Sequence, residues 1–102
     1  MSFSFDTSRI TLNNPYATGQ EFRFSYQVDN VNGDDPGHTD HVTIWDHNSA
    51  TVLDQDVPAP ESVAGGLYGV FVDVPALAAG AYDVAITIAG GVVSAGATIT
   101  VQ

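Results

Sequence analysis

The sequence has 102 residues, 44% of them hydrophobic, which suits one small globular domain with a modest core. Twelve acidic residues stand against Arg9, Arg23 and no lysine, and a formal charge of −10 disfavours nucleic acid and anionic membranes as partners. Such a surface suits cations, basic partners or simple solubility. The absence of cysteine excludes disulfides, thiolate nucleophiles and cysteine-ligated metals.

The first residues, MSFSFD, lack the basic and apolar regions of a signal peptide, and no apolar run approaches the roughly 18 residues of a membrane span. We expect no insertion into a membrane. If Met1 is the native start, we expect a cytoplasmic or non-classically exported protein. If the domain is part of a longer chain, we expect an extracellular or cell-surface location.

Apolar and polar residues alternate with a period of two along the whole chain, and no window has an apolar stripe of helical period. This pattern predicts an all-β protein. A first strand runs from Phe3 through a kink to Leu12, and the clearest strand, EFRFSYQV, follows at 21–28. The remaining predicted strands lie at 41–46, 50–57, 66–74, 82–88 and 92–101, with the strand at 50–57 at a sheet edge.

Seven short strands with turn signals between them predict one β-sandwich over residues 1–102, made of antiparallel strands in two sheets. Within it, Leu77, Gly80 and Tyr82 have the spacing of a tyrosine corner, in which a buried ring sends its hydroxyl back to the backbone of a crossing loop. With the segments FRFSYQVDN, HVTIWD and AYDVAITIAGGVVS, nearly the whole chain resembles the immunoglobulin-like modules of bacterial and archaeal surface proteins, of the CARDB type. That resemblance implies an immunoglobulin-like Greek-key β-sandwich of about seven antiparallel strands and says little about function.

The acidic segment 29–41, DNVNGDDPGHTDH, is a candidate calcium loop. Asn30, Asn32 and Asp34 have the first spacings of an EF-hand loop, but its sixth position holds an aspartate and its twelfth a histidine. A looser calcium cage would use the acids Asp29, Asp34, Asp35 and Asp40. The alternative is a solvated loop whose Asn, Gly and Pro serve turn geometry.

The three histidines raise the question of a transition-metal site, together with the neighbouring acids Asp40 and Asp46. His41 and His47 lie six residues apart, roughly 20 Å on an extended strand, so they cannot hold one ion together. Only His38 with Asp40 or His41 could chelate a metal. The alternative is that the histidines are surface residues without a ligand.

Trp45 has two interpretations. If Val42 and Ile44 face the core, then His41, Thr43 and Trp45 face outward and form a shallow platform for a sugar ring or a protein partner. With the opposite register, Trp45 is a core residue.

The sequence contains no nucleophile elbow, phosphate-binding glycine loop or metal-hydrolase spacing, and we therefore predict no catalytic residues and no required cofactor. We expect a non-enzymatic structural, adhesive or protein-interaction module, a unit of a larger surface or extracellular assembly. The alternative is a small carbohydrate- or calcium-binding module that uses Trp45 and the segment 29–41.

Overall fold

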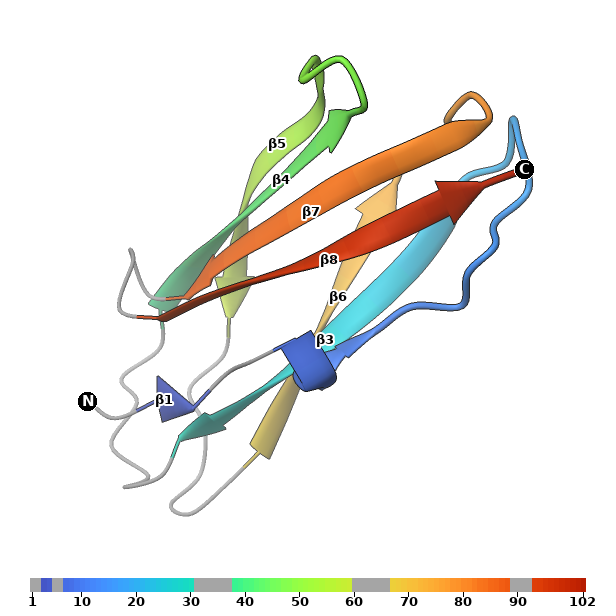
Figure 1. Ribbon diagram of the computed structural model, residues 1–102. Coiled ribbons are helices and arrows are strands. Elements are labelled where there is room, and N and C mark those ends of the chain that lie inside the picture. The colour runs from blue at the N-terminus through green and yellow to red at the C-terminus, as the bar shows by residue number, and fades with distance from the viewer. Residues whose placement is uncertain (1–2, 5–6, 31–37, 60–66, 89–92) are drawn as a thin grey trace.

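Two antiparallel β-sheets pack face to face in the computed structural model, which describes residues 3–4, 7–30, 38–59, 67–88 and 93–102 (Figure 1). The described elements are β1 (Phe3–Ser4), the short 3-10 helix η1 (Thr7–Arg9), β2 (Ile10–Thr11), β3 (Phe22–Asn30), β4 (His38–Asp46), β5 (Thr51–Ala59), β6 (Leu67–Val74), β7 (Gly80–Ile88) and β8 (Val93–Val101).

The first sheet is built around β3, which pairs with β6 along one edge and with both β1 and β2 along the other. β1 and β2 are therefore two pieces of the first predicted strand, separated by η1 where the sequence predicts a kink. The second sheet has the order β5-β4-β7-β8. The fold class, seven antiparallel strands in two sheets, is confirmed.

The core lies between the sheets and follows the period-two alternation of the strands. In the clearest strand, Phe24, Tyr26 and Val28 are buried, while Arg23 and Gln27 are exposed. The two sheets contribute inward side chains that pack as one cluster. The other buried hydrophobic residues are Val42, Ile44, Val57, Val70, Val72, Val74, Leu77, Tyr82, Val84, Ile86, Ile88, Ile99 and Val101.

The predicted strand boundaries on both sides of the acidic segment are wrong. β3 continues to Asn30 and β4 begins at His38, so both ends of the acidic segment 29–41 belong to strands. The polar composition of these residues suggested a loop, but a strand ladder is held by backbone groups and extends for as long as a neighbour pairs with it. Asp29 pairs with Leu67, and His38 pairs with Ala59.

The crossing between the sheets has the geometry expected of a tyrosine corner. Tyr82 is buried and its hydroxyl donates a 2.7 Å hydrogen bond to the carbonyl oxygen of Ala78. Leu77 is also buried, and Gly80 begins β7 with a φ of 153°, which residues other than glycine rarely adopt. The bond satisfies the phenol hydroxyl and ties the crossing loop to β7.

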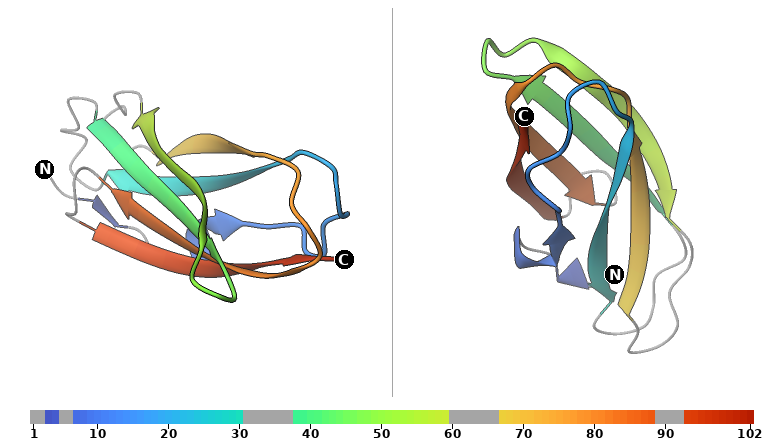
Figure 2. Two further views of the ribbon diagram at one scale, coloured as in Figure 1. Left: turned by 90° about the horizontal axis from the view of Figure 1, so that it is seen from above. Right: turned by 90° about the vertical axis from the view of Figure 1, so that its right-hand side faces the viewer.

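The sandwich is elongated, with principal extents of 41 × 21 × 19 Å. β1 lies toward one end of the long axis, and the C-terminal end of β8 lies at the other (Figure 1). Between β2 and β3, the chain crosses to the second sheet and runs beside the end of β8, as the views of Figure 2 show. β1 and the C-terminal end of β8 are therefore separated along the length of the module.

Candidate functional site

The outer face of the second sheet, β5-β4-β7-β8, is the candidate binding surface. Its register places three side chains of β4, namely His41, Thr43 and Trp45, in the middle of the face. Each of these residues belongs to a row of paired residues that crosses all four strands, from β5 through β4 and β7 to β8. The rows are Asp56–His41–Thr87–Ser94, Asp54–Thr43–Ala85–Gly96 and Thr51–Trp45–Asp83–Thr98.

Trp45 is on the outer side of the sheet and is half-buried. It pairs with the exposed Asp83 of β7 and with Thr51 of β5, while its chain neighbour Ile44 is fully buried. The pairing with β5 shifts at a bulge between Ile44 and Trp45. Of the two orientations that the sequence left open, the structure therefore has the outward one, with small or short neighbours beside the indole.

His41 lies between two carboxylates of the adjacent edge strand. Its Nδ1 is 2.8 Å from Asp56 Oδ1, and its Nε2 contacts Asp54 Oδ1. The hydrogen bond to Asp56 and, to a smaller extent, the one to Asp54 raise the pKa of His41, because both carboxylates favour the charged imidazolium. The cluster is half-exposed to solvent, so these charges belong to the outer face of the sheet rather than to the core.

Asp40 lies in the interior and not among solvated loop acids. Because β4 begins at His38, the alternation that buries Val42 and Ile44 extends back to Asp40, which is fully buried. Its Oδ2 accepts a 2.6 Å hydrogen bond from the hydroxyl of Tyr26, which is also fully buried. This carboxyl group is therefore part of a polar pair in the core.

Of the other acids of the predicted calcium cage, the structure describes only the backbone of Asp29. The backbone of Asp29 lies in β3, whereas Asp34 and Asp35 fall outside the described residues. In the described part of the chain, no three His, Cys, Asp or Glu side chains are placed to hold a metal ion.

The transition-metal hypothesis is not supported at the residues that it named. The ring nitrogens of His41 contact Asp54 and Asp56, which the sequence did not connect with it. Asp46 uses Oδ1 to accept hydrogen bonds from the backbone of Asn48 and Ala50, and it closes its own turn. The side chain of His38 is not described.

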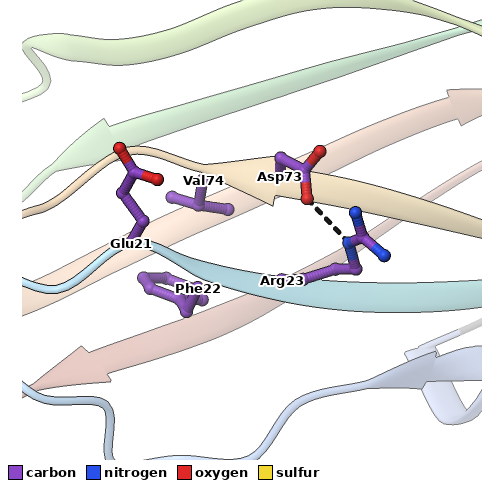
Figure 3. Close-up of a pocket in the computed structure, with 5 residues that line it drawn as sticks. All are labelled: Glu21, Phe22, Arg23, Asp73 and Val74. Atoms are coloured by element: carbon purple, nitrogen blue, oxygen red, sulfur yellow. Dashed lines mark hydrogen bonds and ion pairs between the residues drawn. The ribbon is translucent and has the colours of Figure 1, made fainter.

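A shallow hollow lies on the first sheet (Figure 3). It is lined by Glu21, Phe22, Arg23, Asp73 and Val74. Arg23 Nε donates a 2.7 Å hydrogen bond to Asp73 Oδ1, which lowers the pKa of Asp73. This pair satisfies the two central charges, and the lining residues include no serine, cysteine or histidine that could act as nucleophile or base.

Beside the hollow, Phe71 is 66% exposed, and the guanidinium carbon of Arg23 lies 5.5 Å from the centre of its ring. This is a cation–π distance, so Arg23 partly shields the phenylalanine. The first sheet thus offers a second exposed aromatic residue. Within the residues described, no helix has the length and hydropathy to cross a membrane.

Comparison with protein-family models gives no match, and comparison with curated proteins gives none. Solved structures do match the fold. The CARDB domain of a Pyrococcus furiosus protein, crystallised in complex with di-metal ions, has a TM-score of 0.67 and 12% identity, covering 99% of this chain and 88% of that one. The resemblance to CARDB modules is thereby confirmed at the level of the fold.

Two further matches show the same sandwich within other proteins. The β-glucosidase from Listeria innocua in complex with gluconolactone has a TM-score of 0.68 and 12% identity, over 99% of this chain but 16% of the enzyme. The C-terminal domain of Wzt has a TM-score of 0.60 and 11% identity, over 88% of this chain and 64% of that one. At these identities the comparisons establish the fold alone.

Proposed function

We propose that the chain is a non-enzymatic structural and protein-interaction module that forms one unit of a larger surface or extracellular protein. The observation that carries the proposal is the position of β1 and of the end of β8 at opposite ends of a sandwich 41 Å long. A domain that the chain enters at one end and leaves at the other acts as a spacer between its neighbours. The match to 16% of a β-glucosidase chain supports the proposal, since there the same fold is one part of a larger protein.

The interaction surface in this proposal is the outer face around Trp45. A half-buried indole on a rigid sheet supplies contact area at little cost in conformational entropy, and tryptophan is frequent among residues that dominate binding energy. Asp83 beside the indole, and Asp54 and Asp56 around His41, give the face polar groups that can orient a partner. Protein partners, including neighbouring domains, fit such a face better than nucleic acid does, given the acidic charge.

The test uses the fact that Trp45 is the single tryptophan of the chain. Candidate partner proteins and a panel of glycans are titrated while the emission of Trp45 is followed, and affinities are measured in parallel by calorimetry. We expect binding to shift the emission and Trp45→Ala to abolish binding. Phe71→Ala, which removes an exposed aromatic from the opposite sheet, is the matched control and should retain affinity. Binding that survives Trp45→Ala unchanged would contradict this assignment, and a glycan as the ligand would favour a carbohydrate-binding module.

A second candidate function is calcium binding, favoured by the di-metal complex of the CARDB domain with the same fold. A site in this chain would draw on Asp29, Asp34 and Asp35, because Asp40 is committed to Tyr26 in the core. Thermal melting with millimolar calcium should then raise the midpoint by several degrees, and magnesium should not. An unchanged midpoint would remove this candidate.

A further inference from the structure

Residues 14–18 pair with residues 98–102, the end of β8 and Gln102, in a contact that the sequence did not predict. Tyr16 and Val101 form a parallel bridge, so the two segments run in the same direction. Three backbone bonds lie at the centre of the pairing, and side-chain bonds lie at both of its ends. The backbone bonds are Tyr16 N to Thr100 O (2.8 Å), Gln102 N to Tyr16 O (2.9 Å) and Thr18 N to Gln102 O (2.9 Å).

The side chain of Asn14 extends this ladder by one step. Its Nδ2 donates to Thr98 O at 2.9 Å, and its Oδ1 accepts from Thr100 N at 2.9 Å. The amide therefore takes the place of a paired backbone residue next to Pro15, which has no N–H of its own to donate. At the other end, Thr18 Oγ1 donates to Gln102 O. Six hydrogen bonds thus join the two segments.

The same segment is fixed to the rest of the module. The ring of Tyr16 stacks on Phe22 of β3, with centroids 3.9 Å apart and an interplanar angle of 17°. The N–H of Gly19 donates to Leu77 O at 3.1 Å, next to the tyrosine corner. Residues 14–18 consequently connect β8 of the second sheet with β3 of the first.

The direction of the pairing determines how it responds to tension. β1 and the end of β8 lie at opposite ends of the long axis, so a pull on the two ends of the chain drags residues 14–18 and 98–102 in opposite directions along their common axis. Bonds between strands point across the strands, so such a pull stresses the six bonds together. Peeling from one end would instead break them one after another.

We propose that residues 14–18 and 98–102 form a mechanical clasp, which carries tension between the ends of the module and must open before the sandwich is pulled apart. This inference rests on the proposed function, because only a module joined in series to others is loaded through its ends. It adds resistance to force to the role of a spacer.

The test is single-molecule force spectroscopy on a tandem array of the domain, alternated with a marker domain of known unfolding force. Forced unfolding is governed by the unfolding rate, so the readout is the lifetime of the folded domain at constant force. Asn14→Ala removes two of the six bonds and should shorten this lifetime by about ten-fold or more. Thr18→Val removes one bond with little change of shape and should shorten it by about three-fold. It also serves as the second variant if Asn14→Ala does not fold.

Asp46→Ala is the matched control. It also removes two hydrogen bonds, to the backbone N–H groups of Asn48 and Ala50, but from a turn outside the line of tension. We expect it to shift the urea midpoint about as much as Asn14→Ala while changing the lifetime under force by less than about two-fold.

Equal lifetimes for Asn14→Ala and the unsubstituted domain would overturn the clasp, and so would an equal effect of Asp46→Ala. Neither result bears on the interaction surface of the proposed function, which is tested separately by binding at Trp45.

Discussion

The buried pair of Tyr26 and Asp40 gives the sharpest prediction about stability. Tyr26→Phe removes a hydroxyl that donates a 2.6 Å hydrogen bond to Asp40, where both side chains are fully buried. Removing one partner of a buried hydrogen bond costs about 1 to 3 kcal/mol, because water cannot replace it. Taking about 2 kcal/mol, and roughly 4 to 8 °C per kcal/mol for a domain of this size, we expect the melting temperature to fall by roughly 8 to 16 °C.

Two other tyrosine-to-phenylalanine substitutions serve as references for the loss of stability in Tyr26→Phe. The hydroxyl of Tyr82 is partly buried and donates to a backbone carbonyl, so Tyr82→Phe should cost about 1 kcal/mol. The hydroxyl of Tyr16 is exposed and accepts from the N–H of Asn13, so Tyr16→Phe should cost less than about 0.5 kcal/mol.

Urea unfolding followed by circular dichroism measures all three variants under one condition. The expected order of cost is Tyr26, then Tyr82, then Tyr16. A Tyr26→Phe variant as stable as Tyr16→Phe would contradict the placement of Asp40 in the core. It would mean instead that this carboxyl group is solvated, as the calcium-cage hypothesis required.

Three further predictions concern other parts of the fold. In an NMR titration, the pKa of His41 should lie above 6.5 and should fall in Asp56→Asn. Because folding raises this pKa, the stability that it contributes is complete below pH 6.5 and is lost as the pH rises through the folded-state pKa. Gly96→Ala places a Cβ 3.1 Å from a backbone oxygen and should cost about 1 kcal/mol or more in urea unfolding, whereas Gly69→Ala, with 3.9 Å to its nearest atom, should be neutral or stabilising. Ile86→Ala should cost about 2 to 5 kcal/mol, and a smaller loss would place Ile86 outside the core.

Period-two alternation was sufficient to predict the sandwich and most of its inward faces. Side chains of a strand point alternately to its two sides, so a run such as Phe24, Tyr26 and Val28 identifies its buried face from local sequence alone. The spacing of Leu77, Gly80 and Tyr82 is equally local, and the hydrogen bond from Tyr82 to Ala78 spans four residues. These features need no information about distant strands.

The same alternation, applied one step further, would have placed Asp40 inside. Its aspartate identity and the acids around it suggested a solvated loop, and the sequence contains no local sign that Tyr26, fourteen residues earlier, supplies a hydrogen-bond donor. Composition therefore gave the wrong environment where the strand period gave the right one.

What only the tertiary structure decided is which strands lie side by side and in which register. The two acids at His41 come from β5, the neighbour of Trp45 from β7, and the partner of residues 14–18 from the far end of the chain. Alternation determines a face within one strand, whereas contacts between strands depend on turns, bulges and sheet order that the chain settles only when it folds as a whole. The sequence by itself thus determined the two-layer architecture and its core. The long-range pairing decided the outer face around Trp45, the buried polar pair and the contact between residues 14–18 and 98–102.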